Sequence, residues 1–228
     1  MRIGGYIPLS LVDYPHKPAI TVFTRGCNLR CPFCHNGELV IGKEGDTEEA
    51  VLKFLRQRRD QLDAICISGG EPTIQSDLDE FIRQVRALGY SVKLDTNGSR
   101  PEVLLSLLSE GLLDYVAIDI KSSPHRYRQA TGGRLEFATV AKSVGLVRNS
   151  GTAYELRTTV VPGLVDLGDL EMIAKLLGPM GRFALQQFRP RQTLDPAFGR
   201  VRPYAKAWFQ KAKEIFQGHT EQLIIRGL

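Results

Sequence analysis

The sequence predicts an α/β protein whose parallel strands form either a partial barrel or a doubly wound open sheet. Short apolar runs alternate with amphipathic helical stretches along the 228 residues, which is the pattern of successive strand–helix units. The runs are nearly continuously apolar, as expected for parallel strands that are covered on both faces. Right-handed crossover connections leave those two architectures. Because there is no repeat and no low-complexity linker, we expect a single domain over residues 1–228.

Six apolar runs are predicted to be strands, and a seventh is a candidate for a last strand. They are Ala19–Phe23, Ala64–Ser68, Ser91–Asp95, Tyr115–Ile120, Tyr154–Val161, Phe183–Phe188 and, as the last, Gln222–Arg226. The preceding stretch MRIGGYIPLSLVDYP is predicted to be a turn-rich lead-in, because it combines glycine and proline with few regular alternations.

Stretches with helical spacing of apolar residues separate these strands. They are predicted at Thr47–Arg59, Asp77–Leu88, Pro101–Ser109, Leu135–Arg148, Leu167–Leu177 and Tyr204–Phe216. Asp46 followed by Glu49 is a candidate cap for the first helix, and Ser76 followed by Asp79 is a candidate cap for the second.

The composition is that of an ordinary soluble protein, with 43% apolar and 24% charged residues. No apolar run reaches transmembrane length and no leader pattern starts the chain, so we expect a cytoplasmic protein without a membrane partner. The formal net charge of +5 comes from 30 basic and 25 acidic residues. Because no basic stripe is interleaved with aromatic residues, nucleic-acid binding is not expected.

Polar and glycine-rich residues follow the ends of the predicted strands. The cysteine-rich loop 24–36 follows the first strand, SGGEPT (68–73) the second and DTNG (95–98) the third. DIK (119–121) ends the fourth strand, and Arg157 lies in the fifth. Because the carboxyl ends of parallel strands meet at one edge, where barrels and open sheets place their active sites, we expect a functional site there.

The loop TRGCNLRCPFCHN holds Cys27, Cys31 and Cys34 at C-x3-C-x2-C spacing. Such spacing in a chain with four cysteines indicates metal or redox chemistry rather than a disulfide scaffold. A structural zinc site would need a fourth ligand. His35 follows its neighbour too closely to reach the same ion easily. Cys66 lies in an apolar run, where a small core residue is expected.

An iron–sulfur cluster is the alternative that three cysteines favour. Each iron of a [4Fe-4S] cluster normally takes one thiolate, so three cysteines leave one iron with an open position. An open metal position is where substrate chemistry takes place. The absence of an evident fourth ligand therefore favours a catalytic cluster, with a zinc-stabilised binding module as the alternative from another class.

The cysteine spacing after the first strand, combined with GGEP (69–72) after the second, resembles the radical S-adenosylmethionine (SAM) enzymes. The resemblance implies a partial (β/α)6 TIM-like barrel of parallel strands, which agrees with the number of strand–helix units. It also implies a [4Fe-4S] cluster on Cys27, Cys31 and Cys34 whose open iron is chelated by SAM. Reductive cleavage of SAM would yield a 5′-deoxyadenosyl radical that removes a hydrogen atom from the substrate, so these three cysteines are expected to be essential for catalysis.

The resemblance implies further roles near the cluster. Phe33 is expected to pack beside the adenine of SAM. The backbone of Gly69 and Gly70 is expected to approach the methionyl amine, with Glu71 supporting that turn.

Residues at the next three strand ends resemble cofactor contacts of glycyl-radical activating enzymes. Asp95 and Thr96 match a DTNG motif near the methionyl group. Asp119 and Lys121 match a D-x-K motif near the ribose and carboxylate, where a zwitterion beside a sulfonium needs both signs of charge. Arg157 resembles an arginine near the cofactor carboxylate. Asp95 and Asp119 are also a candidate site for a monovalent cation.

Longer segments resemble one subgroup, the activating proteins of anaerobic ribonucleoside-triphosphate reductase. They are SLVDYPHKPAITVFTRGCNLRCPFCHN, SGGEPT, DTNG, DYVAIDIKS, YELRTTVV, LQQFRP and IIRGL. Within LQQFRP, Gln187 or Arg189 is a candidate for the adenine side. His16 departs from the glycine expected in the DYPGK of relatives, which leaves the conformation of that turn open.

Activating enzymes of this kind remove hydrogen from a glycine Cα of a large partner enzyme. The resemblance therefore implies anaerobic ribonucleotide reductase as the partner, and a flavodoxin or ferredoxin as the electron donor, whose acidic surface would suit a net basic chain. No auxiliary cluster is expected, because no cysteine-rich segment follows Cys34. The alternative is a radical SAM enzyme of the same fold that acts on another protein or on a small molecule such as a deazapurine precursor.

Overall fold

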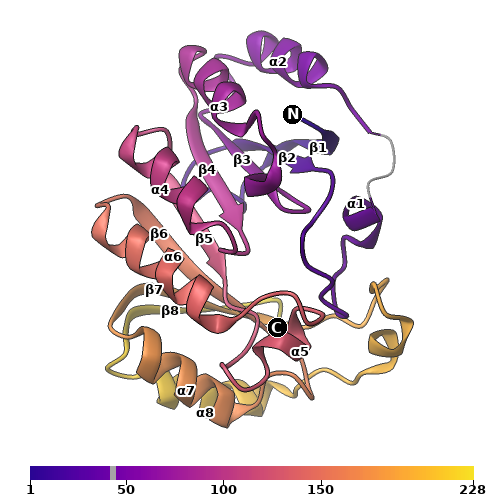
Figure 1. Ribbon diagram of the computed structural model, residues 1–228, viewed down its shortest axis with the longest axis vertical. Coiled ribbons are helices and arrows are strands. Elements are labelled where there is room, and N and C mark those ends of the chain that lie inside the picture. Colours follow the sequence, from indigo (N-terminus) through magenta and orange to yellow (C-terminus); the bar gives the residue numbers. More distant parts are fainter. Residues whose placement is uncertain (42–44) are drawn as a thin grey trace.

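The computed structural model describes residues 1–41 and 45–228, and its centre is one eight-stranded sheet in the order β1-β2-β3-β4-β5-β6-β7-β8 (Figure 1). Seven strands run parallel: β2 (Ala19–Thr24), β3 (Ala64–Gly69), β4 (Ser91–Thr96), β5 (Tyr115–Asp119), β6 (Ala153–Val160), β7 (Met180–Gln187) and β8 (Thr220–Arg226). The first strand, β1 (Ile3–Ser10), is antiparallel to β2. The sheet curves without closing, since β1 and β8 remain its two edges, which confirms the α/β partial barrel.

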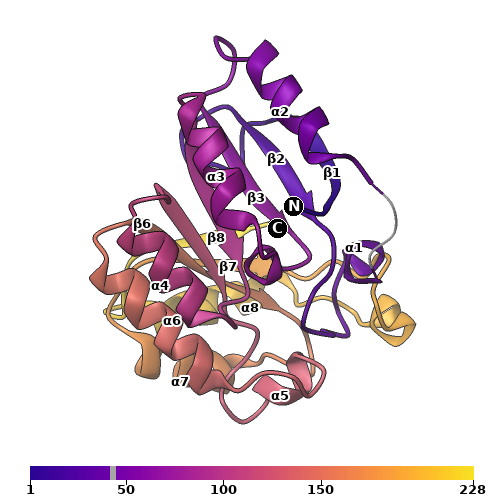
Figure 2. The same cartoon turned by 45° about the horizontal axis from the view of Figure 1, so that its top comes forward.

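Helices cover the outer, convex face of this sheet (Figures 1 and 2). The longer ones are α2 (Glu48–Gln57), α3 (Leu78–Ala87), α4 (Pro101–Ser109), α6 (Phe137–Asn149), α7 (Leu167–Leu177) and α8 (Lys206–Phe216). The short ones are α1 (Gly37–Ile41), α5 (Tyr127–Ala130) and the 3-10 turns η1 (Pro72–Ile74) and η2 (Pro196–Arg200). The six longer helices confirm the predicted ones to within two residues at each end.

Alternation along the strands separates an apolar face from a charged one. In β4, Val92 and Leu94 are fully buried and belong to the main hydrophobic core. Lys93 and Asp95 alternate with them and therefore point to the opposite, concave face of the sheet. The curved sheet thus packs its apolar face on the helices and carries polar groups inside the open barrel.

The N-terminal stretch is the main error of the sequence-based prediction. Instead of a turn-rich lead-in it forms β1, whose Ile3 is fully buried and whose Tyr6 ring packs 5.3 Å from the ring of Phe54 on α2. The two glycines and the proline of IGGYIPLS resemble turn signals. Pro8 is tolerated because β1 is an edge strand, where a missing N–H costs no ladder hydrogen bond.

Both predicted helix caps are also wrong in detail. Thr47, not Asp46, caps α2 by accepting a hydrogen bond from the N–H of Ala50. Asp77 precedes α3 without a side-chain cap bond, so Ser76 does not cap that helix. Such one-residue errors arise because adjacent polar residues compete for the same free helix N–H groups.

The turn before β2 shows the conformation that His16 adopts where glycine was expected. This residue has φ 61°, in the left-handed region that glycine adopts without steric cost. The glycine expected in relatives would relieve that cost.

Among the described residues we find no helix with the length and apolar character needed to cross a membrane.

Candidate functional site

A cavity of about 310 Å³ opens at the carboxyl ends of the central strands. Its wall contains the twelve residues expected to hold the cluster or the main groups of SAM: Cys27, Cys31, Phe33, Cys34, Gly69, Gly70, Glu71, Asp95, Thr96, Asp119, Lys121 and Arg157. It also contains residues that the sequence did not indicate as site residues, among them Asn36, Thr159 and Gln186. The predicted convergence of strand ends on one site is therefore present in the structure.

The cysteine loop is pressed backbone to backbone against the GGEP turn. The N–H of Glu71 donates to the carbonyl of Gly26 at 2.9 Å, and the N–H of Gly70 donates to the carbonyl of Thr24 at 2.9 Å. A Cβ placed on Gly70 would lie 1.9 Å from the Gly26 carbonyl oxygen. Only a residue without a side chain fits there, so the glycine pair sets how closely the two loops approach.

The far side of the cysteine loop is held by the segment that follows β7. The N–H of Leu194 donates to the carbonyl of Cys34 at 2.9 Å, and the N–H of Asp195 donates to the carbonyl of Pro32 at 2.9 Å. The His35 Nε2 lies 2.7 Å from the carbonyl oxygen of Arg189, and the His35 ring stacks on Phe188 at 5.7 Å. These contacts give His35 a structural role in the loop.

The three loop cysteines share the cavity, whereas Cys66 does not line it. None of them forms a disulfide. Burial raises the pKa of Cys27 and raises the pKa of Cys31 to about 12, so a bound cation would be needed to hold these groups as thiolates. The N–H of Leu29 already donates to Cys27 Sγ at 3.4 Å.

The donor set of the loop, three thiols on one cavity wall, fits a [4Fe-4S] cluster. Within residues 1–41 and 45–228, no three His, Cys, Asp or Glu side chains converge closely enough to hold one metal ion. A [4Fe-4S] cluster requires no such convergence, because each iron takes its own thiolate. Cys66 is fully buried in β3 and accepts a hydrogen bond from Lys93 Nζ at 3.6 Å, as a core residue.

Glu71 ties the GGEP turn to the end of β4. Its carboxylate is almost fully buried and accepts hydrogen bonds from Thr73 N–H at 3.1 Å, from Thr96 Oγ1 at 2.7 Å and from Asn97 N–H at 2.7 Å. Burial raises the pKa of Glu71, and these donors only partly offset that effect. Glu71 therefore positions two neighbouring strand ends relative to each other.

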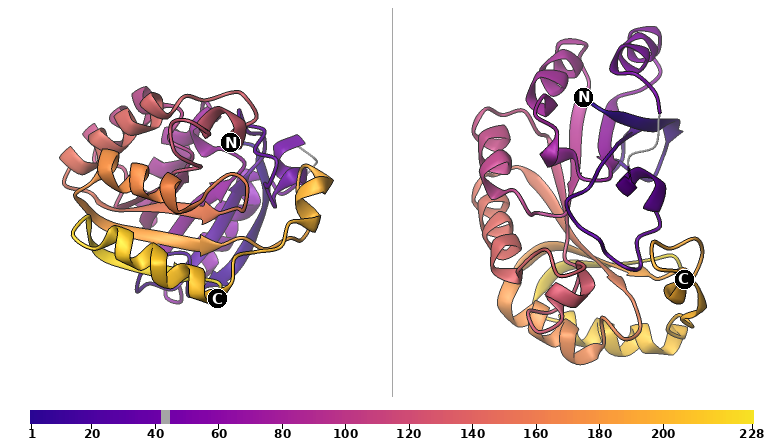
Figure 3. Two further views of the ribbon diagram at one scale, coloured as in Figure 1. Left: turned by 90° about the horizontal axis from the view of Figure 1, so that it is seen from below. Right: turned by 45° about the vertical axis from the view of Figure 1, so that its right-hand side comes forward.

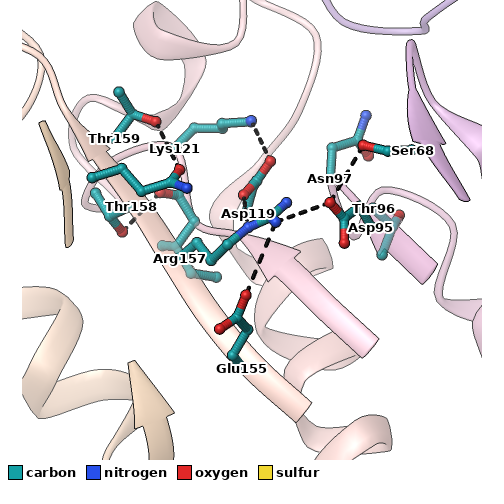
Figure 4. Close-up of polar contacts among 12 residues, drawn as sticks. Ser68, Asp95, Thr96, Asn97, Asp119, Lys121, Glu155, Arg157, Thr158 and Thr159 are labelled. Carbon is teal, nitrogen blue, oxygen red and sulfur yellow. Dashed lines mark hydrogen bonds and ion pairs between the residues drawn. The ribbon is translucent and has the colours of Figure 1, made fainter. Parts of the chain in front are cut away.

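Five alternating charges run across β4, β5 and β6, and we call Lys93, Asp95, Arg157, Asp119 and Lys121 the charge ladder. Figure 4 labels Asp95, Arg157, Asp119 and Lys121. Arg157 Nη1 lies 2.9 Å from Asp95 Oδ2, and Arg157 Nε lies 2.8 Å from Asp119 Oδ1. Lys121 Nζ donates to Asp119 Oδ2 at 3.1 Å, and Lys93 pairs with Asp95. Each charge thus faces an opposite one.

The ladder fixes the ionisation of its members. Burial alone would raise the pKa of Asp119, but the cations of Arg157 and Lys121 outweigh it and hold that pKa well below its ordinary value. Burial would lower the pKa of Lys121, and Asp119 reverses this effect, so the pKa of Lys121 is raised. The pKa of Asp95 is lowered by Arg157 and Lys93 in the same way, against the effect of burial. All five groups are therefore charged at neutral pH.

Glu155 is a part of this site that the sequence did not reveal. Its carboxylate is 1% exposed and accepts two hydrogen bonds from Arg226 at 3.1 and 2.8 Å. Arg182 Nε lies 3.6 Å and Arg157 Nη1 4.0 Å from its oxygens. A charged residue within the apolar-looking strand AYELRTTV was the signal that could have indicated it. Glu155 connects the charge ladder to the last strand, β8.

The glutamines of β7 and the pair Asp95 and Asp119 differ from the sequence-based expectation. Of the adjacent glutamines of β7, Gln186 lines the cavity, whereas Gln187 donates to the carbonyl of Tyr204 at 2.6 Å. Strand register decides which of two neighbours faces inward. Neither candidate for the adenine side, Gln187 or Arg189, lines this cavity, and their contact with adenine stays a prediction. Between Asp95 and Asp119 the structure places the Arg157 guanidinium, and a monovalent cation there stays a prediction.

The Radical SAM superfamily is the family whose sequence model matches this chain, over residues 21–177. The chain belongs to the radical SAM superfamily. The matched part begins in β2, includes the cysteine loop and the charge ladder, and ends with α7. The radical SAM fold therefore accounts for the whole cavity except the β7 side.

Among curated relatives, a protein of Methanocaldococcus jannaschii assigned as a glycyl-radical enzyme activating enzyme is 35% identical, over 98% of this chain and 95% of its own length. The pyruvate formate-lyase-activating enzyme of Clostridium pasteurianum is 32% identical over 72% and 71%. A protein of Thermococcus kodakarensis assigned as a GTP 3′,8-cyclase is 29% identical over 78% and 59%. This radical SAM enzyme thus has its strongest similarity, among these three, to a protein of the activating type.

Solved structures support the fold alone. SuiB of Streptococcus suis, bound to S-adenosylmethionine, superposes with a TM-score of 0.69 at 15% identity, over 89% of this chain. The chain spans 48% of SuiB. A domain of pyruvate-formate lyase-activating enzyme from Bacteroides vulgatus gives a TM-score of 0.57 at 14% identity, over 72% of this chain and 99% of that domain.

Proposed function

We propose that this radical SAM enzyme activates a glycyl-radical enzyme, and that the partner is anaerobic ribonucleoside-triphosphate reductase. The observation that carries the proposal is the single cavity that joins the cysteine loop to the DTNG and D-x-K residues of the charge ladder. Similarity over almost the full length to a protein assigned as a glycyl-radical enzyme activating enzyme supports the activating function. The electron donor in this proposal is a flavodoxin or ferredoxin.

Cys27, Cys31 and Cys34 would hold a [4Fe-4S] cluster in this cavity. A bound cluster with SAM supplies one-electron reduction and a carbon radical able to remove a hydrogen atom from a glycine Cα. The cysteine loop fixes the positions of the three thiols, because its backbone is hydrogen-bonded to the GGEP turn and to residues 194–195. Phe33, which is 5% exposed, and Leu29 give the wall an apolar part, which would exclude water around the adenine of SAM.

The charge ladder would orient the amino-acid end of SAM. Lys121 and Arg157 offer positive charge to a carboxylate, and Asp95 and Asp119 offer negative charge to an ammonium or a sulfonium. The ladder holds three cations and two carboxylates, each beside a group of opposite sign, so a zwitterion would meet both signs of charge in an ordered site. Glu71 and Thr96 would keep the neighbouring backbone of Gly69 and Gly70 in place for the amine.

The partner can be tested directly by anaerobic reconstitution with iron, sulfide, SAM and a reductant. Each glycyl-radical protein of the host is added in turn, and electron paramagnetic resonance is recorded. We expect a glycine-centred doublet with anaerobic ribonucleotide reductase, and none when Cys31→Ala replaces the wild type. SAM cleavage with no doublet from any candidate protein would reject the activating function. A doublet from a different protein would reject only the choice of reductase.

A second candidate is a radical SAM enzyme that acts on a small molecule, and the similarity to a protein assigned as a GTP 3′,8-cyclase favours it specifically. The same reconstituted enzyme, supplied with GTP in place of a protein partner, separates the two. Formation of 5′-deoxyadenosine that depends on GTP would support the small-molecule function. Cleavage that depends only on the reductase would support activation.

A further inference from the structure

A second cavity lies inside the open barrel beside the first. It has a volume of about 640 Å³ and shares Arg157 and Gln186 with the cavity described above. The remaining wall is formed by Val12, Asp13, Pro15, Lys93, Glu155, Arg189, Arg226 and Gly227. A group bound there would therefore lie directly beside the residues that line the cofactor cavity.

The second cavity opens between the two edges of the sheet. Val12, Asp13 and Pro15 follow the edge strand β1, whereas Arg226 and Gly227 end the other edge strand, β8. Figure 3 (right) shows β1 and the C-terminus on the same side of the molecule. The unclosed side of the barrel is thus the route from solvent into this cavity.

Exposed apolar side chains lie in β1 and in the residues that follow it, next to the second cavity. Ile7 is 44% exposed, Leu9 55%, Leu11 72% and Val12 84%, and we call Ile7–Val12 the apolar edge. In the described part of the chain, eight large apolar residues have exposed side chains, and these four are half of them. Contiguous apolar exposure of this kind marks interaction surfaces in soluble proteins.

The backbone of the apolar edge is available for pairing. Within the described residues, β1 has β2 as its only sheet neighbour, so its other side has no strand partner. The first half of β1 is approached by other residues: a Cβ on Gly4 would lie 2.2 Å from the Leu39 side chain. The second half is exposed. Pro8 removes one N–H from it and the pairing with β2 shifts register between Ile7 and Ser10, so an added strand would pair there over a short and interrupted stretch.

The cavity next to the apolar edge carries more cations than carboxylates. Lys93, Arg157, Arg189 and Arg226 line it, against Asp13 and Glu155. The exposed guanidinium of Arg189 lies beside Gly227 and forms no ion pair within the part of the chain that the structure describes. It is available to a carboxylate that comes from outside.

We propose that the apolar edge and the second cavity are the docking site for an extended segment of the partner protein. This inference rests on the proposed function, because the partner is the glycyl-radical protein. The segment pairs with the free edge of β1, places apolar side chains on Leu9, Leu11 and Val12, and directs an acidic residue to Arg189. An extended chain fits because a helix would leave the N–H and C=O groups of the β1 edge without partners.

The test compares two pairs of exposed apolar residues in the reconstituted holoenzyme. The variant Leu11→Ser/Val12→Ser removes the two most exposed apolar side chains of the apolar edge, and the control Leu105→Ser/Leu176→Ser removes side chains that are 51% and 53% exposed on α4 and α7. The probe is the host's anaerobic ribonucleotide reductase, with the dissociation constant measured by anaerobic calorimetry and the glycyl radical by electron paramagnetic resonance.

We expect the dissociation constant to rise about tenfold or more in the edge variant, as for apolar anchors at the centre of an interface, and by less than about twofold in the control. The Arg189→Gln variant is expected to raise it about threefold and to weaken its dependence on salt. SAM cleavage without the partner is expected to be the same in the edge variant and the control.

Three outcomes would overturn the inference, and they are distinguishable. If wild-type enzyme gives no glycyl radical with any host candidate, the proposed function fails and the docking site fails with it. If the radical forms and the edge variant binds like the control, only the docking site fails. If the edge variant instead loses self-association in light scattering, or loses reduction by flavodoxin with unchanged reductase affinity, the apolar edge belongs to a second copy or to the electron donor.

A photo-crosslinking residue in place of Val12 gives a second, independent measurement. We expect it to join the reductase through one short segment, identified by mass spectrometry after digestion. Cross-links spread over many reductase segments would contradict a single extended segment at the apolar edge.

Discussion

The cysteine loop and the charge ladder line the same cavity but are held in place by different forces. Residues 24–36 are positioned mainly by backbone hydrogen bonds to two neighbouring segments and by the close approach of Gly70 to Gly26. The charge ladder is positioned by side-chain ion pairs among β4, β5 and β6. One region depends on backbone shape, and the other depends on the register of parallel strands.

The difference shows how substitutions in each region should behave. Backbone contacts allow little relaxation, so a misplaced Cβ in the loop is expected to disturb the whole metal site. Ion pairs in a partly buried network tolerate loss of one partner better when a neighbouring charge can substitute. In the ladder, Asp119 faces both Arg157 and Lys121, and Arg157 faces both Asp95 and Asp119. The cluster should therefore respond to loop changes and SAM affinity to ladder changes.

The largest effect is expected from the cluster ligands. Cys27→Ala, Cys31→Ala and Cys34→Ala should each abolish the bound cluster and SAM cleavage, because each thiolate serves a different iron. Cys66→Ala is the control and should retain both, since Cys66 lies outside the cavity. Iron and sulfide content and the visible absorption spectrum measure the outcome. Loss of the cluster in Cys66→Ala would show that the ligand assignment is wrong.

The next effect is expected from Gly70. In Gly70→Ala the new methyl group meets the Gly26 carbonyl at 1.9 Å, so the loop must move. We expect a loss of about 3 kcal/mol in unfolding free energy, as for severe overpacking, together with reduced cluster content. The matched control Gly145→Ala lies inside α6 with nothing within 4 Å, and should gain about 0.5–1 kcal/mol. Chemical denaturation under argon measures both, and equal stabilities would contradict the close approach.

Arg157→Lys tests the ladder without removing its charge. Arg157 reaches Asp95 and Asp119 with two different nitrogens, which one ammonium cannot do. We expect SAM to bind about tenfold more weakly while the cluster spectrum stays unchanged. Equilibrium dialysis with labelled SAM gives the affinity. A variant that lost the cluster but kept SAM affinity would reverse the assignment of the two regions.

The pH dependence of stability tests the ionisation of the ladder. Because the folded pKa of Asp119 lies below its ordinary value of 3.8, Asp119 stabilises the fold above about pH 4. That contribution is lost as the pH falls through the lower folded pKa. The stability difference between wild type and Asp119→Asn should therefore be constant from pH 5 to 7 and shrink on acidification. Urea unfolding from pH 7 down to below pH 4 measures this difference, and a difference that grew on acidification would have the wrong sign.

The smallest effect is expected at His16, outside both regions. Replacing this residue by glycine removes the cost of its φ of 61° but adds freedom to the unfolded chain. We expect a net gain of about 0.5–1 kcal/mol in unfolding free energy, with cluster content and SAM affinity unchanged. Thermal unfolding is a sufficient measurement. A loss of stability would mean that the His16 side chain contributes more than its backbone costs.

Much of this molecule was predictable because its signals are local. The strands Ala64–Ser68 and Ser91–Asp95, the helices Pro101–Ser109 and Leu167–Leu177, and the placement of polar residues at strand ends all follow from short-range patterns. The strand β1 was not predictable in this way. Its glycines and proline resemble a turn, and it is a strand because β2 offers an edge to pair with.

By itself the sequence determined the three-cysteine loop, the alternation of parallel strands with helices and the set of residues that meet at the carboxyl edge, because spacing and alternation are properties of the chain alone. Tertiary structure decided which charges pair, since Asp95, Asp119 and Arg157 come from three strands whose register brings them together. It likewise decided that Gln186 rather than Gln187 faces the cavity, and that Glu155 joins β8 to the site. Ion pairs and facing directions depend on neighbouring strands, and a linear sequence does not specify the distance between groups on different strands.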